Sequence, residues 1–159
     1  MPRRRPPKII GEWVECEFLA RAAQHGLVVS KPYGDSAPFD FVVGGRQPLH
    51  RVQVRATSVF GNRAFRCSIG RLWPRTRFNP RNYDFLAVYV IPYQAWYLIP
   101  TRSIRGARWA ITLFPHVRNS KGKYEQFRDA WRLLGPTRNT FLRHLSFIAR
   151  SEKVRARER

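Results

Sequence analysis

The first patterned segment of the chain predicts an α-helix from Ile10 to His25. Nothing in this segment breaks a helix, and Gly26 stands where a C-terminal cap is expected. At 100° per residue, the face expected to meet solvent carries Glu17, Arg21 and Gln24, and the opposite face carries Leu19, Ala22 and Ala23. Glu12 and Glu15 project with the apolar face. The core side of this helix is therefore expected to hold two carboxylates.

Later segments predict β-strands, because they are apolar or alternate between apolar and polar residues and are bounded by turn residues. They are residues 27–30, 39–43, 49–57, 64–69, 84–91, 95–99 and 108–114. The segment 84–91 is almost continuously apolar, which is typical of a central strand. These strands follow one helix, so the pattern indicates an α/β protein.

Residues 39–43 and 49–57 are expected to form a hairpin, joined by a turn that begins at Gly44-Gly45. A hairpin symmetric about its turn pairs Val43 with His50, and the same register places Asp40 opposite Gln53. In the second strand, Arg51, Gln53, Arg55 and Thr57 point one way, and Val52, Val54 and Ala56 point the other way. This alternation is typical of a half-covered strand. It places Arg55 on the face shared by Asp40 and Gln53.

Toward the C-terminus, apolar residues again recur at helical spacing. They are Tyr124, Phe127, Trp131 and Leu134, ahead of a stop at Gly135-Pro136, and then Phe141, Leu142, Leu145, Ile148 and Ala149 in a final amphipathic helix. We expect one domain over residues 9–150. Residues 1–8 are interpreted as a basic arm whose prolines prevent a helix, lying along a nucleic-acid backbone or disordered. Residues 151–159 form a basic tail that frays.

The charge of the chain indicates what kind of partner the protein binds. Thirty Lys and Arg residues stand against ten Asp and Glu, which gives a formal net charge of +20. Solubility requires far less, so the partner is expected to be a polyanion. Five of the 30 cations are lysine and 25 are arginine, whose planar fork matches phosphates and guanine edges. A GC-rich coding bias would explain this ratio but not the charge.

A membrane surface is also anionic, but no stretch approaches the roughly 18 apolar residues that span a bilayer. No signal-peptide run follows the first charges, so we expect a cytoplasmic protein that binds no membrane. Cys16 and Cys67 are isolated and are interpreted as reduced thiols.

Residues 71–83 have no period and predict a loop suited to nucleic acid. Arg71, Arg75, Arg77 and Arg81 alternate there with Trp73, Phe78 and Tyr83. Arginines contact the backbone and aromatic rings stack on unpaired bases. The alternative is a solvated loop whose aromatic residues pack into the core. Lys31, outside this loop, is also expected to contact nucleic acid.

The acidic residues are concentrated early in the chain. Five of the ten precede residue 41, namely Glu12, Glu15, Glu17, Asp35 and Asp40. A buried carboxylate needs a cation, a metal ion or hydrogen-bond donors. The hard oxygen donors of Asp40 and Gln53 suit Mg²⁺ or Mn²⁺. Alternatively, Gln53 and Arg55 face solvent and Asp40 is an ordinary turn or salt-bridge residue.

The order of these residues resembles a known family. Gly11-x-x-x-Glu15, then Gly26, Asp40 and Gln53-Val54-Arg55, is similar to the core of PD-(D/E)xK nucleases. The start resembles archaeal Holliday junction resolvases. The fuller phrase, with Lys31-Pro32-Tyr33-Gly34-Asp35-Ser36 and Asp40-Phe41-Val42-Val43, resembles the bacterial group I intron-associated branch that includes homing endonucleases. The likeness covers residues 9–57, 84–100 and 124–134.

This resemblance implies a restriction-endonuclease-like α/β core with a central mixed sheet flanked by helices. It implies a DNA endonuclease that uses Mg²⁺ or Mn²⁺, of homing or junction-cleaving type. In that case Glu15 helps to hold the metal, Asp40 is its principal ligand, and Val54 is a further ligand. Gln53 stands where many relatives carry a second acid. Cutting both strands of a duplex calls for two active sites, so a dimer or tetramer is expected.

Arg55 departs from the family pattern, which has lysine at this position. Lysine can position or help to deprotonate the attacking water, whereas arginine stays charged and offers a fixed fork of donors. Arginine can stabilise a transition state but cannot act as a base. One alternative is therefore a DNA-binding module that has lost hydrolysis. Another is a basic RNA- or ribosome-associated protein, which charge alone supports.

Overall fold

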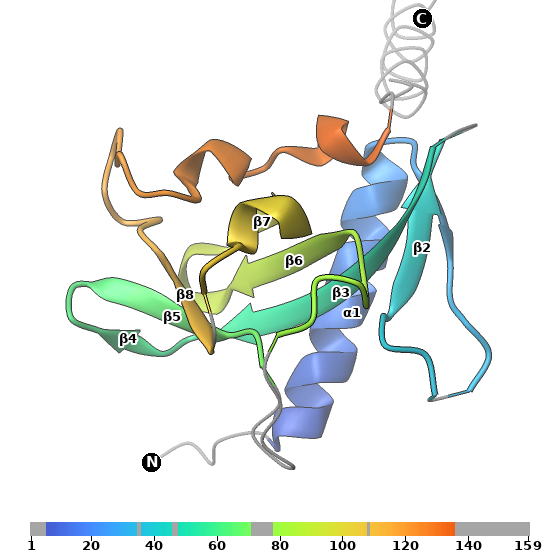
Figure 1. The fold of residues 1–159 in the computed structure, drawn as a ribbon, viewed down its shortest axis with the longest axis horizontal. Helices are drawn as coiled ribbons and strands as arrows, with labels where there is room; N and C mark the ends of the chain where they lie inside the picture. Colours follow the sequence, from blue (N-terminus) through green and yellow to red (C-terminus); the bar gives the residue numbers. More distant parts are fainter. Residues whose placement is uncertain (1–5, 35, 46–47, 71–77, 108, 136–159) are drawn as a thin grey trace, which may run out of the picture.

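The computed structural model describes residues 6–34, 36–45, 48–70, 78–107 and 109–135 (Figure 1). A first sheet follows the helix α1 (Pro7–Gln24) and contains β1 (Val28–Ser30), β2 (Phe41–Gly44), β3 (Leu49–Thr57), β6 (Phe85–Val90) and β7 (Ala95–Pro100). A second sheet contains β4 (Phe60–Gly61), β5 (Ala64–Ser68) and β8 (Ala110–Leu113). Short 3₁₀ helices are η1 (Ile91–Tyr93), η2 (Thr101–Ile104), η3 (Glu125–Phe127) and η4 (Trp131–Leu134).

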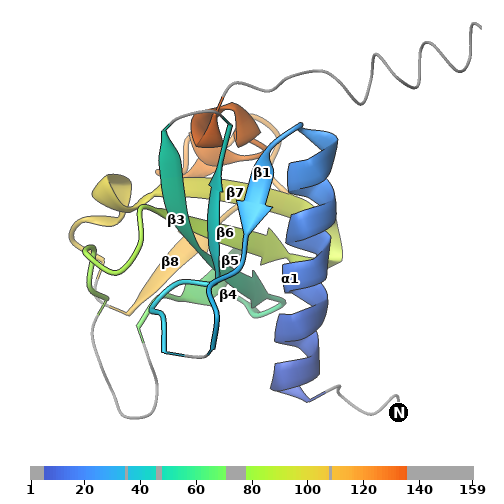
Figure 2. The same ribbon diagram turned by 90° about the vertical axis from the view of Figure 1, so that its right-hand side faces the viewer.

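The larger sheet is mixed, as expected for the fold class. Its strand order is β1-β2-β3-β6-β7, the pairing of β3 with β6 is parallel, and the other pairings are antiparallel. Helix α1 covers one face (Figure 2). The smaller sheet, in the order β4-β5-β8, covers the other face. Every residue of β6 and β7 is buried because both faces of these strands are covered.

Helix α1 begins at Pro7, three residues earlier than expected, so the prediction that the arm cannot be helical is wrong for Pro7 and Lys8. Proline at a first helical position loses no hydrogen bond, because its missing N–H would have no partner there. At the other end Gly26 adopts φ = 69°, which confirms the cap position. Residues 1–5 lie outside the described residues.

The buried face of α1 differs from the predicted face. Val14, Phe18 and Ala22 form a narrow stripe at a spacing of four residues and pack against the sheet. Leu19 and Glu12, which were expected on the core side, are exposed. The helix contacts the sheet mainly along this stripe. Two further apolar residues of the helix have partners, since Ile10 packs against the same core and the Trp13 ring lies 5.8 Å from the Tyr89 ring.

The β2–β3 hairpin confirms the predicted register, with Val43 paired to His50. The expected half-covered strand is wrong for the second half of β3. Gln53 is 7% exposed and Thr57 is 5% exposed, although both belong to the polar set. For Thr57 the reason is the second sheet, since its Oγ1 donates to the carbonyl of Arg66 in β5.

The helical spacing around residues 124–134 produces two 3₁₀ turns, so a continuous helix is not formed. Asp129 adopts φ = 47°, and its N–H donates to Trp96 O at 2.8 Å. Arg128 forms an isolated bridge with Tyr97. Trp131 and Leu134 are still buried, because the segment crosses the end of the sheet and the core. The helix expected over residues 141–149 and the basic tail lie outside the described residues.

No helix in the part of the chain that the structure describes is long and apolar enough to cross a bilayer.

Candidate functional site

Asp40 lies where β2 separates from β3. The two strands pair as far as Phe41 and Val52, and the Asp40 N–H donates to Val52 O at 3.0 Å. Two residues further along β3, the N–H of Val54 donates to Asp40 Oδ2 at 2.7 Å. The carboxylate thus replaces the backbone acceptor that β2 would have supplied. This bond holds Asp40 at the edge of β3, within reach of its central residues.

Gln53 meets Asp40 as the hairpin register predicts. Its Nε2 donates to Asp40 Oδ2 at 2.5 Å and lies 3.4 Å from Val54 O. Both donors to Asp40 reach Oδ2, so Oδ1 takes no hydrogen bond from the described residues. The amide of Gln53 carries an acceptor as well as donors, and a half-turn of the amide would present Oε1 in place of Nε2.

The environment of Asp40 favours its neutral form. Burial raises the pKa of the Asp40 carboxyl, and the negative charge of Glu15 adds to this rise. The hydrogen bond from Val54 and the positive charges of Arg55 and Lys31 lower the pKa. The net pKa is above the ordinary value. A carboxylate desolvated in this way gains from the approach of a further cation.

Glu15 enters the site from α1. Its Oε2 lies 2.8 Å from Lys31 Nζ, and the side chains of Lys31 and Glu15 are 64% and 26% exposed. Glu12 is exposed on the same helix and does not share this position. The structure thus separates two glutamates that the sequence placed together, and brings one of them to the site.

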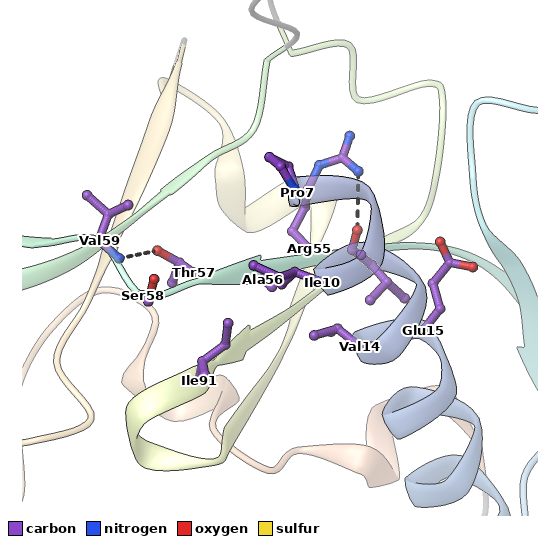
Figure 3. A pocket seen from close by; sticks show the side chains of 12 residues that line it. Pro7, Ile10, Val14, Glu15, Arg55, Ala56, Thr57, Ser58, Val59 and Ile91 are labelled. Carbon is purple, nitrogen blue, oxygen red and sulfur yellow. Dashed lines mark hydrogen bonds between the residues drawn. The ribbon is translucent and has the colours of Figure 1, made fainter. Parts of the chain in front are cut away.

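Arg55 lies on β3 beside these residues. Its Nη1 donates to the carbonyl of Val54 at 3.2 Å (Figure 3). Its charge also reaches the second sheet, since it lowers the otherwise raised pKa of Cys67 and of Tyr83. Burial dominates at both groups and raises each pKa to about 12. Arg55 is therefore a fixed positive charge at the junction of the site and the core.

A pocket of about 520 Å³ adjoins these residues (Figure 3). Glu15 of α1 and Arg55 of β3 stand on its walls. Apolar residues from α1, β3 and the start of η1 complete the lining, among them Ile10, Val14 and Ile91. Glu15, Val54 and Arg55 thus border a cavity between the helix and the sheet, whereas Asp40 and Gln53 are not among its lining residues.

The donor set fits a hard divalent cation. Asp40 and Glu15 offer carboxylates, Val54 a carbonyl and Gln53 an amide oxygen, and oxygen donors of this kind suit Mg²⁺ or Mn²⁺. The described residues contain no cluster of three or more His, Cys, Asp or Glu that could hold a metal. Any ion here would rely on amide and carbonyl oxygens beside two carboxylates.

The residues expected to contact nucleic acid are placed in part. Arg71, Arg75 and Arg77 lie outside the described residues. Arg81 is exposed, and its carbonyl accepts from Arg51 Nη1 at 3.0 Å. The buried residues between the larger sheet and the second sheet, among them Cys67, Leu86 and Ile111, form a second core cluster. Tyr83 belongs to this cluster and Phe78 packs against it, as the alternative interpretation of this loop expected.

Lys31 was expected at a nucleic-acid surface, and the structure places it on Glu15. Sequence reasoning missed this contact because the two residues are sixteen positions apart on different elements. The charge signs alone gave no reason to pair these two among thirty cations.

The chain is similar to known proteins over most of its length. A family model for the PD-(D/E)XK endonuclease matches residues 6–134 of the chain. Among solved structures, the bacterial homing endonuclease I-Ssp6803I is similar, with a TM-score of 0.67 and 21% sequence identity. The match covers 87% of this chain and 95% of that chain, and it shows a shared fold. No curated protein sequence matches.

Proposed function

Because the chain belongs to the PD-(D/E)XK endonuclease family, we propose that it hydrolyses DNA phosphodiester bonds with a divalent metal ion, as an endonuclease of homing or junction-cleaving type. The observation that carries this proposal is the position of Asp40. Its carboxylate is held on β3 by Val54 and Gln53, and Glu15 acts on it electrostatically from α1. A family match alone would not require these residues to meet.

Asp40, the Val54 carbonyl, Gln53 and Glu15 would hold Mg²⁺ or Mn²⁺. Such an ion, when bound, activates water and stabilises negative charge on a phosphate. In the hydrolysis, a water oxygen forms a bond to phosphorus and the bond from phosphorus to the leaving sugar oxygen breaks. The water gives up a proton to solvent, and the leaving oxygen takes one up. Arg55 supplies a fixed charge that stabilises the phosphate as its charge grows.

The proposal also covers the partner and the oligomeric state. A net charge of +20 suits the phosphate backbone of duplex DNA. Cleavage of both strands needs two sites, so we propose a homodimer or tetramer as the cutting form.

Nicking of supercoiled plasmid with Mg²⁺ or Mn²⁺ tests this function. The parent protein should nick, and Asp40→Asn should abolish nicking because an amide binds these ions more weakly than a carboxylate. Glu15→Gln should slow nicking less, since a helix acid often reaches the metal through water. Manganese affinity, measured by electron paramagnetic resonance, should fall in Asp40→Asn, while DNA affinity in EDTA stays the same or tightens.

Glu12→Gln is the matched control, because it makes the same change on the exposed side of the same helix. It should nick like the parent. If Asp40→Asn nicks at the parent rate, the assigned site is wrong. If the parent binds DNA and nicks with neither ion, the chain is a DNA-binding module of this fold and not an endonuclease.

A further inference from the structure

Lys31 is an exposed residue that contacts Glu15 of the candidate site. It directly follows β1, and its Nζ lies 2.8 Å from Glu15 Oε2 and 5.8 Å from the centre of the Phe41 ring. Phe41 is the neighbour of Asp40, and the charge of Lys31 lowers the pKa of Asp40. The ammonium group thus contacts the carboxylate of Glu15 and acts on the carboxylate of Asp40 through its charge. Its side chain is 64% exposed, so a ligand can approach it from solvent.

Arg55 is directed differently. Its Nη1 donates to Val54 O, within its own strand, and its charge acts on Cys67 and Tyr83 of the second core cluster. The guanidinium is therefore partly engaged by the protein itself. The lysine of the family pattern is absent from this position. Among the described lysines, Lys31 is the one that contacts a carboxylate of the site, that of Glu15.

We propose that Lys31 contacts the reacting phosphate in this chain. It would supply the ammonium group that the family pattern has at position 55, where this chain has arginine. The proposal rests on the nuclease function proposed above, and it concerns a residue outside the motif strand. Lys31 reaches the site from the end of β1, and Arg55 remains a fixed charge on β3.

The charges of the site explain why such a group is needed. Asp40 and Glu15 both repel a phosphate, and a phosphate that enters the site must come close to both. An ammonium on a flexible stem can contact a carboxylate and a phosphate oxygen in turn. The contact with Glu15 keeps the Lys31 ammonium beside that carboxylate. A DNA phosphate arriving from solvent meets this cation ahead of the two carboxylates.

A double-mutant cycle in DNA binding tests the contact without any cleavage. The variants are Lys31→Met, Glu15→Gln and the two combined, and the probe is a 30-base-pair duplex in EDTA over a range of salt concentrations. If Lys31 contacts phosphate, Lys31→Met weakens binding several-fold and reduces the salt slope by about one, with and without Glu15→Gln. If Lys31 serves as a counterion of Glu15, the loss disappears in the Glu15→Gln background, and the proposal is overturned.

Lys123→Met is the matched control. Lys123 also lies over an aromatic ring, that of Tyr124 at 5.3 Å, and donates to a protein oxygen, that of Arg105 at 3.3 Å. The two substitutions remove the same charge from similar surroundings, and Lys31 alone is at the site. If Lys123→Met weakens DNA binding as much as Lys31→Met does, Lys31 acts only through the overall charge of the protein, and the proposal is overturned.

The nicking rate at saturating plasmid gives the second readout. Lys31→Met should slow nicking by about 10²-fold or more, as removal of one preorganised charge does at such sites, and added ethylamine should restore part of the rate to Lys31→Ala. If Lys31→Met nicks at a rate within a few-fold of the parent rate, the claim that Lys31 acts on the reacting phosphate is overturned. If the parent does not nick at all, the nuclease function fails, and the binding cycle still decides whether Lys31 contacts phosphate.

Discussion

Arg55 is a guanidinium in a position where lysine is the family residue. It stays protonated at any working pH, so it can stabilise charge but cannot accept a proton from water. Its Nη1 holds the Val54 carbonyl at 3.2 Å, which ties the charge to an oxygen of the proposed metal site. The residue therefore contributes electrostatics and local order at the site.

Arg55→Met should slow plasmid nicking by about 10²- to 10³-fold, because a preorganised positive charge is lost from the site. Arg55→Lys should keep most of the rate, since the charge remains. Rates are compared at saturating DNA in Mn²⁺. Arg66→Met, on the exposed side of β5, serves as the control and should leave the rate unchanged. Equal rates for Arg55→Met and the parent would remove Arg55 from the mechanism.

At the scale of elements, one ion pair fastens the parallel pair β3–β6 next to the site. Arg51 Nη2 lies 2.9 Å from Asp84 Oδ1, and the Arg51 N–H donates to Asp84 Oδ2 at 2.8 Å. In return, the Asp84 N–H donates to the Arg51 carbonyl at 2.8 Å. The hydrogen bonds from the Arg51 side chain hold the pKa of Asp84 below its ordinary value, against the effect of burial. This ion pair lies directly before the first parallel pair of the two strands, Val52 with Phe85.

Asp84→Asn should lower the free energy of unfolding at pH 7 by about 1 kcal/mol, a magnitude limited by the exposure of the pair. The pKa of Asp84 is lower in the folded than in the unfolded state. Its stabilisation is thus present above the unfolded pKa and is lost as pH falls through the folded pKa. Urea unfolding should therefore show a difference between parent and variant at neutral pH that shrinks in acid. A difference that grows in acid would contradict this account.

At the scale of the whole molecule, charge governs the affinity for DNA. The net charge of +20 means that binding neutralises many phosphates and releases their counterions. For six to ten phosphate contacts, the affinity for duplex DNA should fall by about 10³-fold or more between roughly 50 and 200 mM salt. Fluorescence anisotropy measures this directly. A flat response to salt would exclude a backbone-binding protein.

The loop 71–83 can be tested in the same titration. Replacing Arg75, Arg77 and Arg81 together with alanine should weaken binding to all sequences and make the salt slope shallower. Unchanged affinity would show that this loop does not contact the backbone.

Local pattern by itself determined several parts of this protein. Alternation and turn symmetry depend on neighbouring residues, so they predicted β3 and the pairing of Val43 with His50 correctly. The same register predicted that Asp40 lies opposite Gln53, and in the structure the two side chains are hydrogen-bonded. The cationic composition indicated a polyanionic partner, and the order of the motif residues indicated the family to which the chain belongs.

Tertiary packing decided the rest, because it depends on which elements meet. The contact of α1 with the sheet chose Glu15 over Glu12, and the path of β1 brought Lys31 to Glu15 across sixteen positions. Gln53, which the alternation placed with the solvent-facing residues of its strand, is 7% exposed in the structure, and its amide donates to Asp40. A hydrogen bond from Asp129 to Trp96 interrupted a helical pattern. Hydrophobic periodicity records which residues prefer burial, but the partner that buries them is set by chain segments far away in sequence.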